Sequence, residues 1–326
     1  MAIVTRIRDL ARQRRAVIFA HNYQRPEVQD IADVVGDSLA LSREAARTDA
    51  DTIVFCGVHF MAETAAILSP SKTVLLPEAA AGCSLADTVT AEDVRRWKRE
   101  HPGAVVVAYV NTSAEVKAES EYCCTSGNAV DVVNAIAPDQ EILFLPDFFL
   151  GAHVRRVTGR SNIRVWMGEC HVHAGITPQS LAAQRASHPD AELLIHPECG
   201  CATSVVEGMS AGDVSPDGAY ILSTEGMIRR PAESSAGKFI VATETGILHR
   251  LRLIHPSKTF LPASEHAECR YMKLTTLASL ERSLETMTHR VVVAEAVRNR
   301  ARLAIERMVS IGGVATSPVL ATSGAR

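Results

Sequence analysis

The sequence repeats one pattern of short apolar runs three times, at an interval of about 88 residues. The runs AVIFAHNYQ, AVVVAYVNT and ELLIHPECG begin at Ala16, Ala104 and Glu192. The last repeat is longer because residues are inserted around 211–218. Each copy ends in a short loop with one cysteine, and these are Cys83, Cys170 and Cys269. Three similar units that each present one thiol predict a three-fold arrangement around a shared centre.

Each unit begins with an amphipathic helix and continues with three strand-like runs separated by helical segments. The expected opening helices are Thr5–Arg15, Ala91–Glu100 and Pro178–Ser187. The expected strands are Ala16–Ala20, Thr52–Phe55 and Thr73–Leu76, then Ala104–Val110, Glu141–Leu145 and Ile163–Trp166, then Ala191–Ile195, Lys238–Val241 and Thr259–Phe260. Near-continuous apolar runs that alternate with helices are typical of parallel strands covered on both faces.

We therefore predict an α/β fold of three pseudo-symmetric three-layer α/β/α domains, with short parallel sheets around a central active site. The expected domains are 1–89, 90–177 and 178–275, followed by closing helices at 276–310 and a disordered tail at 311–326. A further helix is expected at Ser204–Ala211. Units of this size are small enough to depend on one another for a hydrophobic core.

Charge and hydropathy exclude several classes of function. The formal net charge of −3 gives no electrostatic reason to bind nucleic acid or an anionic membrane. No apolar run approaches the roughly 20 residues that span a bilayer, and the start of the chain lacks the apolar segment of a signal peptide. We expect a cytoplasmic protein, in which eight cysteines do not form a disulfide framework.

Polar side chains follow the strands, where ligands collect in parallel α/β sheets. They are His21, Tyr23, Tyr109, Asn111, His196 and Glu198. Histidines near a carboxylate form a plausible acid–base set. Small hydroxyls stand where helices begin, at Ser38, Ser126 and Thr224. They are either ordinary helix N-caps or parts of an anion site, and the two roles are compatible.

The three repeated cysteines are candidates for ligands of one metal centre. An iron–sulfur cube normally takes four cysteines, so three would leave one iron with an exchangeable position. Spacing alone leaves metal ligation and simple burial open. Cys56 fits a buried strand, whereas the Cys123–Cys124 and Cys199–Cys201 pairs lack the spacing of a zinc finger. His59 and Glu63 share a helical face and hint at zinc, although a structural hydrogen bond is the better interpretation.

Several long strings resemble the quinolinate synthase family. They include AHNYQ at Ala20, GDSLALS at Gly36, the string from Tyr109 to Ala129, HPEC at His196 and CRYMK at Cys269. The resemblance implies three pseudo-symmetric domains around one [4Fe-4S] cluster, with Cys83, Cys170 and Cys269 as its ligands. It also implies a transferase of de novo NAD biosynthesis, which condenses iminosuccinate (iminoaspartate) with dihydroxyacetone phosphate to give quinolinate, phosphate and two waters.

The resemblance also assigns site residues. Tyr23 and Glu198 are the expected proton-transfer pair, and His21 and His196 are further catalytic candidates. The expected substrate contacts are His21, Ser38, Tyr109, Asn111, Ser126, His196, Pro197, Glu198 and Thr224, with His173 as a further contact. The expected partners are the two substrates and, transiently, the L-aspartate oxidase or dehydrogenase that makes the imine. No nucleic-acid or membrane partner is expected.

The segment after Glu198 departs from the family pattern. Cys199 and Cys201 follow the carboxylate, and the insertion shifts the placement of Thr224. These two thiols are expected to be buried or redox-sensitive rather than ligands. An aconitase-like hydro-lyase, a cluster-bearing sensor without turnover, and a zinc hydrolase remain the alternative functions.

Overall fold

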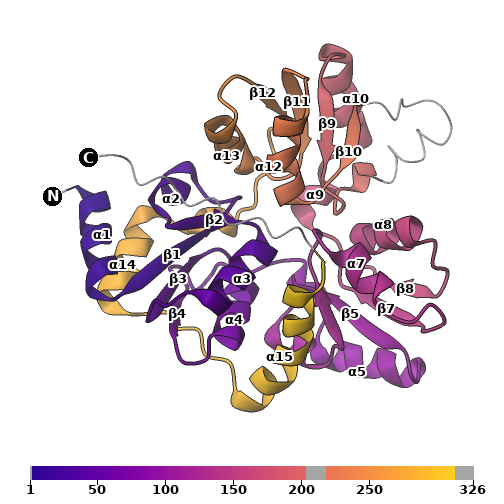
Figure 1. Ribbon diagram of the computed structural model, residues 1–326, viewed down its shortest axis with the longest axis horizontal. Coiled ribbons are helices and arrows are strands. Elements are labelled where there is room, and N and C mark those ends of the chain that lie inside the picture. Colours follow the sequence, from indigo (N-terminus) through magenta and orange to yellow (C-terminus); the bar gives the residue numbers. More distant parts are fainter. Residues whose placement is uncertain (1, 203–217, 313–326) are drawn as a thin grey trace.

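The computed structural model describes residues 2–202 and 218–312. Within these residues, three four-stranded sheets have all their strands parallel. Figure 1 shows the three domains arranged around a common centre, and one end of each sheet faces that centre. The α/β class and the three-fold repetition are therefore confirmed.

The first domain is a sheet covered by helices on both faces. Its strands, in sheet order, are β2 (Val34–Gly36), β1 (Ala16–His21), β3 (Thr52–Cys56) and β4 (Thr73–Leu75). Its helical elements are α1 (Ile3–Gln13), α2 (Pro26–Ile31), α3 (Ser38–Arg47), α4 (His59–Leu68) and η1 (Ala86–Thr88). Helices α3 and α4 pack together on one face, and α1 packs on the other. Strand β1 therefore lies in the centre of the domain.

The second domain repeats this arrangement. Its strands, in sheet order, are β6 (Tyr122–Cys124), β5 (Val105–Tyr109), β7 (Ile142–Leu145) and β8 (Ile163–Val165). Its helices are α5 (Ala91–Glu100), α6 (Ala114–Ala118), α7 (Ala129–Asn134), α8 (Phe148–Thr158) and α9 (His171–Ala174). A capping box formed by Thr90 and Asp93 starts α5, and the helix ends at His101, directly before a proline. Both signals are readable in the sequence.

The third domain has the same sheet order. Its strands are β10 (Ala219–Ile221), β9 (Glu192–Ile195), β11 (Lys238–Ala242) and β12 (Thr259–Pro262). Its helical elements are α10 (Pro178–Ser187), α12 (Thr224–Glu233), α13 (Ile247–Ile254) and η2 (Met272–Leu274). The expected helix at Ser204–Ala211 lies outside the described residues.

The expectation of three strands per unit was wrong, because each sheet has a fourth. The missed strands β2, β6 and β10 each contain three residues and form one edge of their sheet. A run of three residues is too short to show a period in the sequence. The other strands and the opening helices lie within a few residues of their predicted positions. The exact domain boundaries remain a prediction, and most of the predicted tail, residues 313–326, lies outside the described residues.

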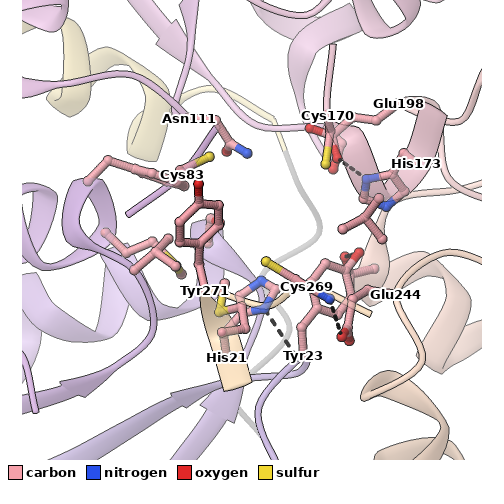
Figure 2. A pocket seen from close by; sticks show the side chains of 18 of the residues that line it. His21, Tyr23, Cys83, Asn111, Cys170, His173, Glu198, Glu244, Cys269 and Tyr271 are labelled. Carbon is pink, nitrogen blue, oxygen red and sulfur yellow. Dashed lines mark hydrogen bonds and ion pairs between the residues drawn. The ribbon is translucent and has the colours of Figure 1, made fainter. Parts of the chain in front are cut away.

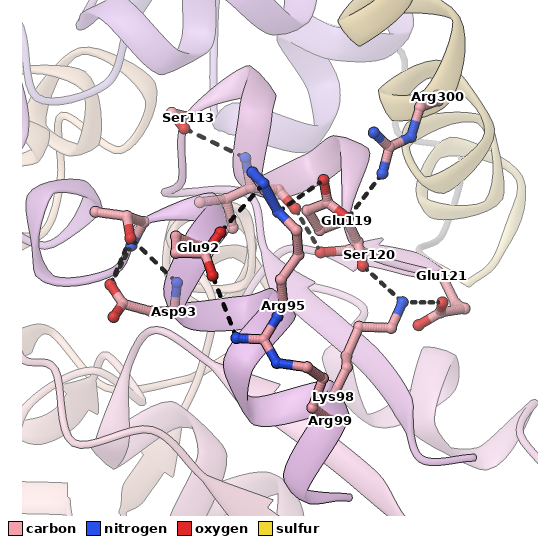
Figure 3. A network of polar contacts seen from close by, with 12 residues as sticks. Glu92, Asp93, Arg95, Lys98, Arg99, Ser113, Glu119, Ser120, Glu121 and Arg300 are labelled. Carbon is pink, nitrogen blue, oxygen red and sulfur yellow. Dashed lines mark hydrogen bonds and ion pairs between the residues drawn. The ribbon is translucent and has the colours of Figure 1, made fainter. Parts of the chain in front are cut away.

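Two helices follow the third domain, and they pack against the first two domains. Helix α14 (Leu277–Thr286) packs against α1 of the first domain, and α15 (Glu295–Ser310) packs against both α6 and α4. Figure 3 shows polar contacts beside α15. Arg300 lies 2.7 Å from Glu119, which also contacts Arg95 at 3.6 Å. Lys98 donates to Glu121 at 2.7 Å. Helix α15 is thus a strap across the first two domains.

The main hydrophobic core is shared among the three domains. One cluster of buried side chains contains Phe19, Phe144 and Phe239, which come from the central strands of the three sheets. A second cluster lies under α1 and α14, and a third lies in the third domain. This continuity supports the expectation that small units depend on their neighbours for burial. No helix in the described residues is long and apolar enough to cross a membrane.

Asn128 provides a test of how much the contacts of α15 stabilise the fold. Its amide donates to the carbonyls of Met308 and Ile311 at 2.8 and 2.9 Å, and its oxygen accepts from the Thr125 amide at 2.8 Å. We expect Asn128→Ala to lower the free energy of unfolding by about 2–4 kcal/mol, because buried groups lose their partners. Urea denaturation would measure this change. The exposed control Asn134→Ala should change it by less than about 0.5 kcal/mol, and equal effects of the two variants would contradict the role of Asn128.

Candidate active site

A partly enclosed cavity lies where the carboxyl ends of the three sheets meet. Side chains of all three domains line it. Figure 2 shows Cys83, Cys170 and Cys269 around this space, together with Glu198, His173 and Tyr23. Parallel strands of each sheet end at the same edge, so residues that follow different strands reach one centre. A cavity therefore lies where the sequence predicts the site.

The three repeated cysteines line this cavity as free thiols, each half-buried. Each lies in a loop after the last strand of its sheet and one to three residues before a short helical turn. The amides two and three residues further along the chain point to each sulfur: Leu85 and Ala86, Val172 and His173, and Tyr271 and Met272. The same socket of two amides thus occurs three times, as the repeat in the sequence suggests.

Burial and the backbone amides shift the pKa values of the three thiols in opposite directions. Burial raises the pKa of Cys83 to about 12, against the effect of its two amides, and burial likewise raises the pKa values of Cys170 and Cys269. Thiols whose pKa is raised by burial favour the neutral form until a metal replaces the proton. Amide hydrogen bonds to sulfur are also what tunes a thiolate-bound cluster. The donor set therefore fits a metal centre with three cysteine ligands.

A buried ion pair fixes the third cysteine loop. Glu244 accepts from the Cys269 amide at 3.0 Å and lies 2.8 Å from the Lys273 ammonium. Lys273 also donates to the carbonyl of Tyr23, at 2.5 Å. Because these contacts join the third domain to the first, the position of the Cys269 thiol is linked to the backbone of Tyr23.

Glu198 contacts two stacked histidines. Its Oε2 atom is 3.1 Å from Nδ1 of His173 and 3.3 Å from Nδ1 of His196, and the rings are 4.8 Å apart. Burial alone would raise the pKa of the Glu198 carboxyl, but His173, His196 and Tyr109 lower it to about 2. Burial lowers the pKa of His173 to about 4. The group thus combines an ionised carboxylate with a neutral imidazole.

These three side chains have a second capacity. One ligand atom from each of His173, His196 and Glu198 lies within 4.8 Å of the others, so the group could also hold a metal ion. Their contacts to one another and to Ser126 already use most of these atoms, because Nε2 of His196 lies 3.2 Å from the Ser126 hydroxyl. An acid–base role accounts for this arrangement without a metal ion at these three side chains.

Tyr23 provides a neutral proton donor on the first domain. Its hydroxyl lies 2.6 Å from the Thr243 hydroxyl and 3.2 Å from the Thr224 hydroxyl. Burial raises its pKa well above the ordinary value for tyrosine. His21 stacks edge-on against its ring, and burial followed by repulsion from His196 lowers the pKa of His21 to about 3. Both side chains are therefore uncharged at neutral pH.

The three small hydroxyls line the cavity, but they are not N-caps. Asp37 caps α3 one residue before Ser38, and Ser223 caps α12 one residue before Thr224. The Ser126 hydroxyl faces His196, and Asn128 is the cap position of α7. The N-cap interpretation was therefore wrong by one or two residues. Because Asp37 and Ser223 cap α3 and α12, the hydroxyls of Ser38 and Thr224 can contact a bound anion.

The remaining cysteines lie apart from this donor set. Cys56, Cys123 and Cys124 are fully buried free thiols. A disulfide joins Cys199 to Cys201, so neither is a thiolate ligand in this structure. The expectation that they are buried is confirmed, and the bridge is local because it spans two residues. It is the one disulfide among the described residues, so the cysteines form no framework.

The suggested zinc pair has a structural role. Glu63 accepts from the Ala114 amide at 3.0 Å, and its other oxygen lies 3.7 Å from His59. Burial raises the pKa of Glu63, against the effect of nearby Lys117. These contacts connect α4 of the first domain to α6 of the second, as expected for a structural hydrogen bond.

The structure brings nearly all of the predicted site residues together. The predicted residues that line the cavity are His21, Tyr23, Ser38, Cys83, Tyr109, Asn111, Ser126, Cys170, His173, His196, Glu198, Thr224 and Cys269. Pro197 is buried and is not among the described residues that line it. Thr243, Glu244 and Lys273 were missed. Thr243 and Glu244 directly follow β11, so the strand-end rule could have found them.

Fold and site together define an α/β enzyme whose active site lies at the junction of three domains. The family model described as quinolinate synthetase A protein matches residues 5–310. A quinolinate synthase from Mycobacterium sp. (strain KMS) is 59% identical over 306 residues, covering 94% of this chain and 91% of that protein. That of Mycobacterium tuberculosis (strain ATCC 25618 / H37Rv) is 57% identical over 306 residues, covering 94% and 88%. The chain belongs to the quinolinate synthase A family.

A reductase of known structure gives a much weaker match. It is the E-1-hydroxy-2-methyl-but-2-enyl-4-diphosphate reductase from Plasmodium falciparum, at 12% identity and a TM-score of 0.32, covering 87% of this chain and 95% of that one. A likeness of this size supports no argument about the site.

Proposed function

We propose that this protein is a quinolinate synthase, which condenses iminosuccinate with dihydroxyacetone phosphate to give quinolinate, phosphate and two waters. The observation that supports it best is the convergence of three thiols, one from each repeat, with the Glu198 group in one cavity. Membership of the family supports the same activity. We also place the protein in the cytoplasm, where the enzyme that makes the imine would supply its substrate.

The cofactor proposed for this site is a [4Fe-4S] cluster. Cys83, Cys170 and Cys269 would hold it, and the pair of backbone amides at each sulfur suits thiolate ligands. When bound, a cluster with three cysteine ligands supplies one iron with an open position, which acts as a Lewis acid on a substrate oxygen.

Glu198 and Tyr23 would handle the protons of the reaction. The condensation and the dehydrations each require a proton to leave carbon and another to reach a departing oxygen. Glu198 is an ionised base held by His173 and His196, while Tyr23 keeps its proton because it is buried. A carboxylate and a phenol that line the same cavity can accept and donate protons in turn.

The hydroxyls at Ser38, Ser126 and Thr224 would bind the anionic parts of the substrates. Dihydroxyacetone phosphate carries a phosphate, and iminosuccinate carries two carboxylates. Helices α3 and α12 begin at Ser38 and Thr224, and Asp37 and Ser223 already accept from amides of their first turns, so the hydroxyls themselves would supply these contacts. The three hydroxyls come from the three domains, so substrate binding would hold the domains together around the cavity.

The test is an anaerobic assay of the reconstituted chain. We expect about four irons and four sulfides per chain, and formation of quinolinate from the two substrates. A fully loaded protein that forms no quinolinate would overturn the proposal. An aconitase-like hydro-lyase would instead turn over a stable hydroxy acid, so the same preparation should be assayed with such acids as a comparison.

A further inference from the structure

The lining of the cavity carries acidic groups but no basic side chain of the lysine or arginine type, among the residues that the structure describes. It includes the carboxyl groups of Asp37, Glu198 and Glu244, besides the three thiols. The proposed substrates add a phosphate and two carboxylates, and thiols that hold a metal are thiolates. Burial of so much negative charge is unfavourable unless positive charge lies nearby. A compensating cation is therefore expected behind the lining.

Lys117 on α6 has the position that this cation needs. It is 0% exposed, which makes it the most deeply buried lysine or arginine of the described residues. We propose that the Lys117 ammonium supplies positive charge to the cavity from behind its lining, and thereby stabilises the anionic substrates and the cluster. This inference rests on the proposed function, because that function defines which anions the cavity binds.

The contacts of Lys117 place it one layer behind two segments that line the cavity. Its ammonium lies over the ring of Phe60, 5.4 Å from the ring centre, and Phe60 itself lines the cavity. The ammonium also donates a hydrogen bond to the carbonyl of Thr112, the neighbour of Asn111, which lines the cavity as well. The face of an aromatic ring and a carbonyl oxygen both attract a cation. Lys117 therefore lies where the first and second domains meet.

The charge of Lys117 is less neutralised than that of two other cations of the interior. Lys273 lies 2.8 Å from Glu244, and Arg250 interacts with Glu225. Within the part of the chain that the structure describes, no carboxylate forms an ion pair with Lys117. Its positive charge is therefore available to anions in the cavity.

The surroundings of Lys117 couple its charge to that of the cavity. Burial lowers the pKa of Lys117, and Cys123, Glu63 and Cys83 act against this effect. Glu63 accepts from the Ala114 amide at 3.0 Å, so it is fixed beside the same helix. Cys83 is one of the three thiols of the cavity, and a thiolate there would favour the ammonium form of Lys117. The anions and Lys117 are thus expected to stabilise one another.

Three substitutions separate the charge of Lys117 from its packing and its hydrogen bond. Lys117→Met removes the charge and keeps the length of the side chain, whereas Lys117→Gln removes the charge and keeps a donor for the Thr112 carbonyl. Lys72→Met is the matched control. Lys72 is also partly buried and donates to a carbonyl, that of Ala50 at 2.7 Å, but it directly precedes β4, at the end of the sheet away from the cavity.

The experiment compares these three variants with wild type, all loaded with the cluster. We expect both Lys117 variants to bind quinolinate about tenfold more weakly in calorimetry, the size of effect that one unit charge has in a partly buried site. We also expect a lower midpoint potential of the cluster in both, measured by redox titration with EPR, because loss of positive charge disfavours addition of an electron. Lys72→Met should have the Kd and the potential of wild type.

Several outcomes would overturn the proposal. One is a wild-type Kd or a wild-type potential in both Lys117 variants. Another is a return to wild-type values in Lys117→Gln, which would show that the hydrogen bond to Thr112 matters rather than the charge. If Lys117→Met does not fold, Lys117→Gln replaces it with the same expected shifts, and failure of both to fold would indicate a structural role instead. A loaded wild type that binds quinolinate but forms none would contradict the proposed function alone, because neither measurement requires turnover.

Discussion

Glu198→Gln is expected to lower the rate of quinolinate formation by about 10²- to 10⁴-fold, the range for loss of a general base. The substitution keeps the size of the side chain but removes the charge that His173 and His196 surround. Steady-state kinetics on the cluster-loaded protein would measure it. Binding of quinolinate should weaken far less than kcat falls, because the lost interaction belongs to proton transfer.

A suitable control is Glu265→Gln, which changes an exposed carboxylate. It should have the activity of wild type, and both variants should contain as much iron as wild type. A Glu198→Gln enzyme within about threefold of the wild-type rate would contradict the base assignment. It would also favour a cluster-bearing sensor, whose function needs no turnover.

Replacing any one of Cys83, Cys170 and Cys269 by alanine is expected to remove the iron–sulfur cluster and, with it, nearly all activity. Each thiol comes from a different domain, so no neighbouring cysteine of the described cavity can take its place. Anaerobic absorption and EPR spectra, with iron analysis, would measure the loss directly and without an activity assay.

Cys56→Ala provides the matched control, because Cys56 is a fully buried free thiol on β3 and does not line the cavity. That variant should keep the spectrum of the wild-type cluster. If the three cavity variants also keep it, the assignment of the ligands is wrong. Loss of iron in the Cys56→Ala variant alone would also show that the assignment of the ligands is wrong.

Much of the site could be predicted because it follows strands. His21 ends β1, and Tyr109 ends β5, while His196 comes directly after β9. Their neighbours in the sequence are apolar runs of ordinary strand length, so the positions stand out. The repeat predicted the three cysteines of the site, since they stand at matching points of the three units. Both signals are visible in a single amino-acid sequence, so these residues could be predicted from it.

The parts that could not be predicted depend on contacts between distant segments. At α3 and α12, two adjacent polar residues could each be the N-cap. The exact start of the helix decides that Asp37 and Ser223 take this position rather than Ser38 and Thr224. The link between Thr243 and His173 joins residues 70 positions apart. The Cys199–Cys201 bridge lies in the segment after Glu198, which departs from the family pattern.

The path of α14 has a consequence for synthesis of the chain. Ile7 and Ala11 of α1 share a buried cluster with Leu280 and Leu284 of α14, and Arg6 pairs with Glu281. A ribosome releases the first segment long before the second exists. The first domain is thus completed only after α14 has been made, and the apolar face of α1 stays uncovered until then. Cofactor loading would then wait for α14, because the cavity needs the first domain in its final form.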